Sequence, residues 1–133
     1  MLKPLTQIGL GYLILGQSLE TLSGGEAQRL TLARELIHPE KGASLFLFDE
    51  PSSGLHPADL PALLTLLDQL VDKGHSVLLI EHNPLVILHA DWIIDLGPGG
   101  GDRGGTVVAS GIPEEILEQS DSLTGAYLAA QLG

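Results

Sequence analysis

The sequence predicts an α/β fold in which helices flank a mainly parallel sheet and a β-hairpin follows near the C-terminal end. Two short apolar runs, at residues 45–48 and 77–80, are typical of buried parallel strands. Between them, leucines recur at helical spacing over residues 58–73. Strands that alternate with helices in this way favour a sheet with helices packed on it.

The first part of the chain predicts two helical segments. An apolar, glycine-containing stretch over residues 2–15 predicts a short helix and a turn. Apolar residues then repeat at helical spacing and predict a helix over 26–38 that stops near Pro39. Because Ser23 is a favoured N-cap and Glu26 stands three residues later, the two residues form a capping box at the start of this helix.

The central helix is expected over residues 58–73. It closes at Gly74, since glycine is the residue type most common just beyond a helix end. Pro61 fits only in a first turn, so the regular helix is expected to start close to it. One face of this helix is apolar and comprises Leu60, Leu63, Leu64, Leu67, Leu70 and Val71.

The last third of the chain predicts a short helix over 84–89 and two strands over 92–96 and 106–109. The glycine-rich loop between these strands contains the letters of a dinucleotide-binding fingerprint at 99–104. That fingerprint is followed by a helix, whereas a strand-like run follows here, so a hairpin loop is the favoured interpretation. Helices are expected to complete the chain within residues 112–131.

Composition narrows the class of protein. The 133 residues suffice for one domain with a modest core. No apolar run reaches about 18 residues and no charged-then-apolar leader opens the chain, so neither a membrane span nor a signal peptide is expected. The absence of cysteine excludes a disulfide framework and a thiolate zinc site, and suits the cytoplasm. The formal net charge of -11 repels a phosphate backbone, which makes this segment alone a poor nucleic-acid surface.

Ser23, Gly24 and Gly25 form a candidate anion site where the first long helix begins. The glycines remove side chains from the first turn and open its backbone N–H groups to a ligand, and the positive end of the helix dipole favours phosphate. An ordinary capped amphipathic helix is the plain alternative. Glycine in a first turn argues against that alternative. It lowers helix stability, so it is expected there mainly where a ligand must approach the backbone closely.

Polar residues follow both apolar strands. Asp49 ends the first strand, where a carboxylate can hold Mg²⁺ directly or through water. The adjacent Glu50 can orient or deprotonate an attacking water, a contribution of roughly 10²–10⁴ in rate. His82 follows the second strand and is expected at the same sheet edge, where it can hydrogen-bond a γ-phosphate or that water. The alternative is that Asp49 and Glu50 are simply solvated acids that cap a strand end. Because the second strand also ends in polar residues, this alternative is the weaker one.

These motifs resemble those of ABC ATPases in their order and spacing. Residues 22–25 resemble the ABC signature, residues 45–50 the Walker B strand, residues 52–56 the D-loop, and His82 the switch histidine. Within that superfamily the Gly-Gly-Glu-Ala-Gln-Arg run at 24–29 resembles the UvrA family, the damage-recognition ATPases of the bacterial excinuclease. Transporters usually carry Gln where this run has Glu.

Other residues extend the resemblance over most of the chain, from residue 5 to residue 128. His56 ends the D-loop as in the UvrA family, where transporters usually carry Asp. Residues 90–105 are very close to the UvrA pattern, and residues 15–21 resemble the second, C-terminal ATPase domain rather than the first. The resemblance implies that 1–133 is a single C-terminal fragment of that domain, with a signature helix at 22–38, Walker B and D-loop at 45–56, a hairpin at 92–109 and C-terminal helices at 112–131.

One motif of the family is missing. No G-x-x-x-x-G-K-[ST] phosphate loop occurs in the sequence, and Lys41 and Lys73 lack its glycine frame. In the family this loop lies well upstream, together with cysteine-rich zinc modules and the DNA-binding surface. The chain therefore looks like the C-terminal piece of a longer protein, or like a split or truncated gene product.

The resemblance implies a nucleotide sandwich that binds ATP and Mg²⁺ between two ATPase halves. The resemblance implies that Ser23, Gly24, Gly25 and Gln28 contact the ATP of the partner half. It implies that Asp49 binds Mg²⁺ and that Glu50 and His82 are catalytic. The D-loop residues it implies are Ser53, Gly54 and His56. The implied partners are the other ATPase half of the same protein, a dimer of the full-length protein, and DNA and other excinuclease subunits through regions mostly outside this chain, with no membrane. Without the phosphate loop, the isolated chain is expected to have negligible ATPase activity.

Two other classes of function remain open from the sequence. The first is another ABC-type ATPase, such as a transporter subunit or a chromosome-structure ATPase head. The second is a non-catalytic interaction domain that keeps the fold as a scaffold. Recovery of ATP hydrolysis on adding the missing upstream half would separate a catalytic fragment from a scaffold.

Overall fold

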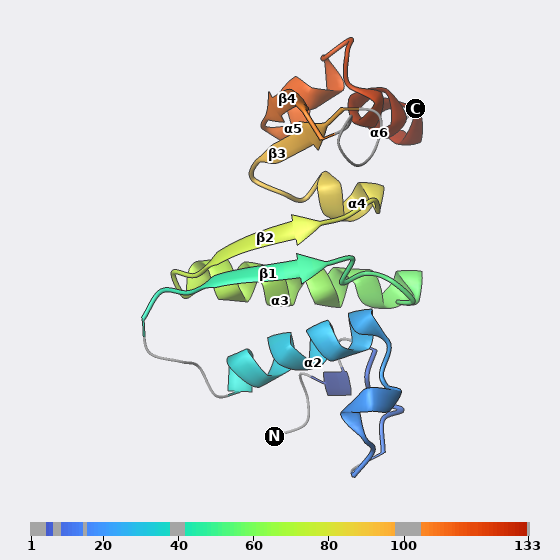
Figure 1. Cartoon of the computed structure of the whole chain (residues 1–133), viewed down its shortest axis with the longest axis vertical. Coiled ribbons are helices and arrows are strands. Elements are labelled where there is room, and N and C mark those ends of the chain that lie inside the picture. The colour runs from blue at the N-terminus through green and yellow to red at the C-terminus, as the bar shows by residue number, and fades with distance from the viewer. Residues whose placement is uncertain (1–4, 7–8, 15, 38–41, 98–104, 133) are drawn as a thin grey trace. The chain divides into compact units, whose positions relative to one another are not determined.

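The chain forms two compact units, Met1–Glu81 and His82–Gly133, each with its own secondary structure (Figure 1). The computed structural model describes residues 5–6, 9–14, 16–37, 42–97 and 105–132. Among the helices of these residues, none combines the length and apolar character needed to cross a bilayer.

The first unit contains a parallel pair of strands, as the two apolar runs predict. β1, Leu45–Asp49, pairs with β2, Ser76–Ile80, and Leu47 lies opposite Leu78. Side chains alternate between the two faces of the pair, because a strand is pleated. The more buried face carries Phe46, Phe48, Val77 and Leu79. The other face is also apolar but exposed, so the expectation of buried strands is wrong for this face, which carries Leu45, Leu47, Leu78 and Ile80.

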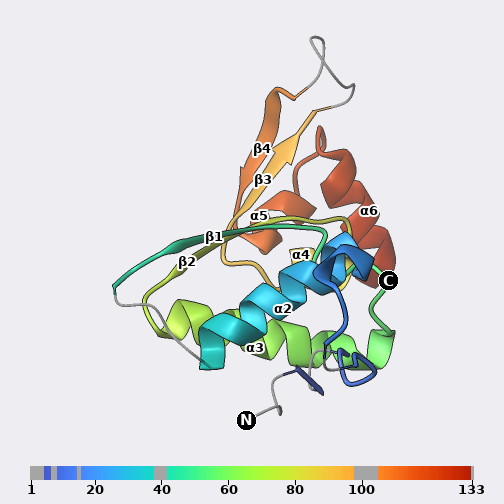
Figure 2. The ribbon, with the colours of Figure 1, turned by 60° about the horizontal axis from the view of Figure 1, so that its bottom comes forward.

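Two helices, α2 at Gly24–Ile37 and α3 at Leu60–Asp72, contact each other and cover one side of the strand pair (Figure 2). Val71 was expected on the buried face of α3 but is 45% exposed. The buried stripe is centred on Leu63, Leu66 and Leu70, which leaves Val71 at its margin. The core residues that the two helices contribute are Leu32, Ala33, Leu60, Leu63, Leu66, Leu67 and Leu70.

The ends of these helices follow the expected local rules. α2 starts at Gly24, directly after the predicted N-cap Ser23 and between the two predicted starts at residues 22 and 26. A 3₁₀ turn, η2 at Pro57–Asp59, precedes α3, so Pro61 falls in the first turn of the regular helix as predicted. Gly74 has φ 89° and donates its N–H to the Val71 carbonyl at 2.8 Å, which confirms it as the residue that closes α3.

Shorter segments precede α2. Of the short helix and turn expected over residues 2–15, residues 5–6 are helical and residues 11–12 form a turn. A 3₁₀ turn, η1 at Leu19–Thr21, then leads into the capped start of α2. These segments place Tyr12 within hydrogen-bonding reach of Glu26.

The second unit is a small α/β arrangement. Its elements are α4 at Pro84–Ile87, β3 at Ile93–Leu96, β4 at Val107–Gly111, α5 at Pro113–Leu117 and α6 at Leu123–Leu132. β3 and β4 pair antiparallel, with Ile93 opposite Gly111, so the expected hairpin is confirmed. The glycine-rich part of its loop, residues 98–104, lies outside the described residues. Ile93, Ala109 and Ile116 form the core of this unit.

The strands of the described residues form two separate pairs, one parallel and one antiparallel. The expectation of a mainly parallel sheet is therefore too simple for this chain. Parallel pairing needs a helical crossover, which α3 supplies between β1 and β2. β3 and β4 are joined by a loop that contains no described helix, and this connection suits an antiparallel pair.

A buried carboxylate fixes α6 in the second unit. Asp95 of β3 accepts hydrogen bonds from the hydroxyl groups of Ser122, at 2.7 Å, and Thr124, at 2.6 Å. The Ser122 hydroxyl oxygen also accepts the Gly125 N–H at 2.7 Å, so Ser122 caps α6 while Asp95 holds the cap. Asp95 is only 8% exposed, and its interactions are internal to the unit.

Candidate functional site

The carboxyl ends of β1 and β2 meet at one edge of the parallel pair, the position where ligands bind in α/β sheets. Asp49 is the last residue of β1 and Glu50 follows it, and both are exposed. The Glu50 N–H donates to the Ile80 carbonyl at 2.8 Å, so the backbone of Glu50 is still tied to β2. This geometry matches the expectation that both acids stand at the sheet edge.

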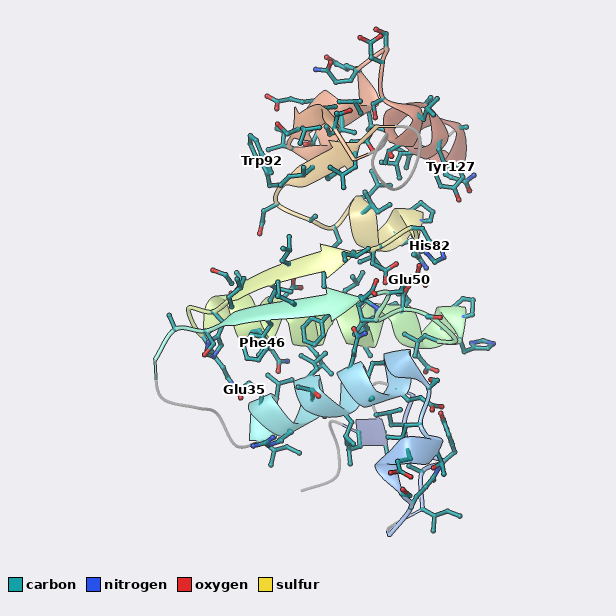
Figure 3. All side chains as sticks on the ribbon, in the orientation of Figure 1. Glu35, Phe46, Glu50, His82, Trp92 and Tyr127 are labelled. Atoms are coloured by element: carbon teal, nitrogen blue, oxygen red, sulfur yellow. The ribbon has the colours of Figure 1, made fainter. Side chains whose placement is uncertain are left out.

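Glu50, labelled in Figure 3, has an unusual backbone conformation. Its φ is 49°, and among the described residues it is the one non-glycine residue with positive φ. Such a conformation costs of the order of 1–3 kcal/mol, and it persists only where the surrounding structure determines it. Residues held in this way cluster at active sites, which strengthens the case for Glu50 as a functional residue.

The start of α2 has the predicted capping box. Glu26 donates its backbone N–H to the Ser23 hydroxyl at 3.3 Å, and the Glu26 carboxylate accepts the Ser23 N–H at 2.7 Å. The Tyr12 hydroxyl donates to the other oxygen of the same carboxylate. Gly24 is exposed in this first turn, whereas Gly25 is buried. The side of the helix start at Gly24 is therefore the one open to a ligand.

Gln28 connects α2 to the end of β1. Its side-chain amide donates to the Asp49 carbonyl at 2.8 Å, and its side-chain carbonyl accepts the Asp49 N–H at 2.8 Å. The resemblance implies that Gln28 contacts an ATP. In this structure both ends of its amide are already paired with the backbone of Asp49.

Arg29 holds the segment that follows Glu50. It is 3% exposed, and its guanidinium donates to the carbonyls of Pro51, at 2.8 Å, and Ser53, at 3.0 Å. A Cβ added to Gly25 would lie 3.0 Å from the Ser53 carbonyl oxygen, so any larger residue would push α2 and this segment apart by a few tenths of an ångström.

Burial also sets the electrostatics of Arg29. Desolvation lowers the pKa of Arg29, while the negative charges of Glu26 and Asp59 act in the opposite direction. Arginine starts so far above neutrality that its guanidinium stays protonated at pH 7. The Nε of Arg29 is buried and has no acceptor among the described residues.

The residues that the resemblance assigns to a D-loop, 52–56, lie on the same segment. The Ser52 N–H donates to the Glu81 carboxylate at 2.9 Å, which ties this segment to the end of β2. Gly54 has φ 68°, a turn conformation that favours glycine. The Nδ1 of His56 accepts the Ala58 N–H at 3.2 Å, so His56 is the N-cap of η2. Ser53 and His56 keep their side chains exposed.

His82 follows Glu81 directly, two residues after β2 ends, and it opens the second unit (Figure 3). Its side chain is exposed. The next residue, Asn83, caps α4 by accepting the Leu85 N–H at 3.0 Å. His82 therefore lies on a short connection between two regular elements.

The side chains at the sheet edge could bind Mg²⁺ only if a bound ligand supplied further oxygen atoms. Within the described residues, no group of three or more His, Cys, Asp or Glu side chains could hold a metal ion. Mg²⁺ is commonly bound by one or two carboxylates together with substrate phosphates and water. The exposed carboxylate of Asp49 fits that mode, in which the phosphates of a nucleotide supply the remaining oxygens.

Two residues that organise this site, Arg29 and Glu81, were missed in the sequence. Arg29 lies on the same face of α2 as the buried residues Gly25, Leu32 and Ala33. A charged residue on the apolar face of a predicted helix could have indicated its role. Nothing in the sequence distinguishes Glu81 from an exposed acid, because its partner is a backbone N–H 29 residues away.

Comparisons with known proteins point to one group of relatives. The chain is 57% identical over 131 residues to UvrABC system protein A of Aquifex aeolicus, and 56% identical over 127 residues to that of Bacillus subtilis. These alignments cover 98% and 96% of this chain, but the chain spans only 14% and 13% of the length of these relatives. No protein-family model matches the chain.

A solved structure agrees with the sequence comparisons. The crystal structure of UvrA2 from Deinococcus radiodurans superposes with a TM-score of 0.87 at 47% sequence identity. The match covers 99% of this chain and 16% of that one. The small parallel pair and the antiparallel hairpin therefore correspond to part of a larger protein.

Proposed function

Because the chain is homologous to a segment of UvrABC system protein A, we propose that it is part of an ABC ATPase that recognises DNA damage in bacterial nucleotide excision repair. The observation that carries this proposal is the arrangement of exposed Asp49 and Glu50 at a strand end against a glycine-opened helix. Residues 15–21 favour the second, C-terminal ATPase domain of such a protein. We place its action in the cytoplasm.

The chain contributes one half to each of two ATP sites. Ser23 and Gly24 at the start of α2, with Gly25 behind them, contact the γ-phosphate of an ATP that another ATPase half holds. In the chain's own site, Asp49 binds Mg²⁺ and Glu50 orients or deprotonates the attacking water.

His82 and the D-loop complete these roles. His82 hydrogen-bonds the γ-phosphate or the water in the chain's own site. Ser53, Gly54 and His56 face the other ATPase half across the sandwich. A contact between Gln28 and ATP would require its amide to leave Asp49.

The phosphate loop comes from the preceding part of the same protein. The exposed apolar face of the strand pair supports this, because parallel sheets occur almost only with both faces covered. That preceding part, a dimer of the complete protein, DNA and the other excinuclease subunits are the partners we propose. The net charge of -11 supports contacts with DNA that lie mostly outside this chain.

A chimera tests the proposal directly. This chain replaces the matching segment of the Aquifex aeolicus protein, and ATP hydrolysis is measured with and without Glu50→Gln. We expect the chimera to hydrolyse ATP, the substitution to lower the rate by about 10²–10⁴, and the isolated chain to show negligible activity. The matched control is Glu20→Gln, a change of an exposed acid in η1 that should leave the rate unchanged.

Two outcomes would contradict the proposal. A properly folded chimera that fails to hydrolyse ATP would favour a non-catalytic scaffold. Single-turnover hydrolysis by the isolated chain, abolished by Glu50→Gln, would show that the chain needs no phosphate loop from another segment.

A further inference from the structure

The end of β1 is held on both of its sides. On one side, the Ile80 carbonyl of β2 accepts the Glu50 N–H at 2.8 Å. On the other side, the N–H and carbonyl of Asp49 both bond to the side-chain amide of Gln28, each at 2.8 Å. One primary amide thus supplies the acceptor and the donor that a neighbouring strand would otherwise provide.

Gln28 belongs to a larger set of contacts that brackets Glu50. Arg29, the next residue of α2, donates to the carbonyls of Pro51 and Ser53. Together the two side chains fix the backbone on either side of Glu50, whose φ of 49° needs such support. We call this set, Gln28 and Arg29 on the backbone of residues 49–53, the helix brace.

We propose that Gln28 is a positioning residue for ATP hydrolysis: through the backbone of Asp49, it holds the carboxylates of Asp49 and Glu50 in register with the start of α2. This inference rests on the proposed function. The first turn of α2 faces one ATP, while Asp49 and Glu50 act on another. The brace therefore fixes the geometry of the chain's two half-sites relative to each other.

A positioning role differs measurably from a direct contact with ATP. A residue that binds ATP equally in the ground state and the transition state changes KM and leaves kcat unchanged. A residue that only positions the catalytic acid changes kcat, because small displacements of reacting groups slow the chemical step strongly. The KM-against-kcat pattern of one substitution therefore separates the two roles.

The first test uses the 133-residue chain alone and does not depend on ATP. Gln28→Met keeps the length of the side chain and removes both hydrogen bonds. We expect the exchange rate of the Asp49 amide hydrogen, followed by NMR, to rise by about tenfold, since a net hydrogen bond is worth about that factor. Gln69→Met on the exposed face of α3 is the matched control and should leave this rate unchanged. Equal exchange rates in the Gln28→Met variant and the unsubstituted chain would overturn the brace.

The second test uses the chimera described above. We expect Gln28→Met to lower kcat by at least about tenfold while KM for ATP changes less than about twofold. Gln28→Glu keeps an acceptor for the Asp49 N–H and loses the donor, so it should give an intermediate kcat. Gln69→Met again serves as the control.

The outcomes of this test are distinct. A raised KM with unchanged kcat would assign Gln28 to ATP binding and overturn the positioning role. An unsubstituted chimera without ATPase activity would overturn the proposed function, and the catalytic role of Gln28 with it. The exchange measurement on the isolated chain would still decide whether the brace itself exists.

Discussion

Asp49 in the first unit and Asp95 in the second unit both belong to short strands, yet their carboxylates are used in opposite ways. The side chain of Asp49 is exposed, and the structure holds its backbone instead. The side chain of Asp95 is 8% exposed and is occupied by two hydroxyl donors. A carboxylate whose bonding capacity is used inside the fold serves stability, whereas one left open on a fixed backbone is available to a ligand.

The residues around Asp49 also hold the backbone and leave its carboxylate exposed. In the first unit, the side chains of Gln28, Arg29 and Glu81 donate to or accept from backbone groups near the strand end. The two bonds from Gln28 fix the backbone of Asp49 and leave its carboxylate uninvolved. Three measurements of stability test the contrast.

The largest effect is expected in the second unit. Asp95→Ala leaves the Ser122 and Thr124 hydroxyls without their acceptor and loosens the cap of α6. We expect the free energy of unfolding to fall by about 2–4 kcal/mol, because hydrogen bonds to a buried charged group are strong. Urea denaturation of the isolated chain measures this loss.

The control for this change is Asp91→Ala, which alters an exposed acid of the same unit and should stay within about 0.5 kcal/mol of the unsubstituted chain. If the two variants unfold at the same urea concentration, Asp95 has no special structural role and the contrast with Asp49 fails.

A smaller loss is expected for Arg29→Leu in the first unit. The substitution removes the donor from the Pro51 and Ser53 carbonyls, and an acceptor left unsatisfied on burial costs about 1–3 kcal/mol. It also removes a buried charge, which offsets part of that cost. Arg34→Leu changes an exposed arginine of the same helix and should have little effect on urea denaturation. A stability gain in Arg29→Leu would mean that burial of the charge outweighs the brace.

The smallest effect concerns the backbone of Glu50. Glu50→Gly and Glu50→Ala both remove the carboxylate, but only glycine adopts a φ of 49° without strain. We therefore expect the glycine variant to be more stable than the alanine variant by about 1 kcal/mol in thermal or urea unfolding, since a left-handed conformation costs other residues about 1–2 kcal/mol. The opposite order would show that the turn relaxes to negative φ in solution.

Much of the local structure could be predicted from the sequence, because it depends on neighbours along the chain. The capping box of Ser23 and Glu26, the first-turn place of Pro61 and the helix end at Gly74 all follow from contacts within a few residues. The two strands and the helix between them follow from hydrophobic periodicity. The hairpin follows from a strand-like run where a dinucleotide site would need a helix.

The acidic residues of the candidate site were predicted from the sequence, but the hydrogen bonds that hold their backbone were not. Asp49 and Glu50 were identified as acids at the end of an apolar strand, and the parallel pairing puts that strand end at a sheet edge. The pairing of Gln28 with Asp49 spans 21 residues and the bond from Ser52 to Glu81 spans 29. Contacts over such separations follow from how α2 packs on the strand, which no local pattern encodes.

The sequence alone thus determined the order of the main helices and strands and which polar groups stand at the strand ends, since propensity, capping and periodicity act over a few residues. Tertiary structure alone decided that Gln28 bonds to the Asp49 backbone, that Arg29 is buried, and that Glu50 adopts positive φ. The physical reason is that a hydrogen bond to a particular backbone group requires two distant segments to meet at about 3 Å. Only the packing of the helices on the parallel pair brings them together.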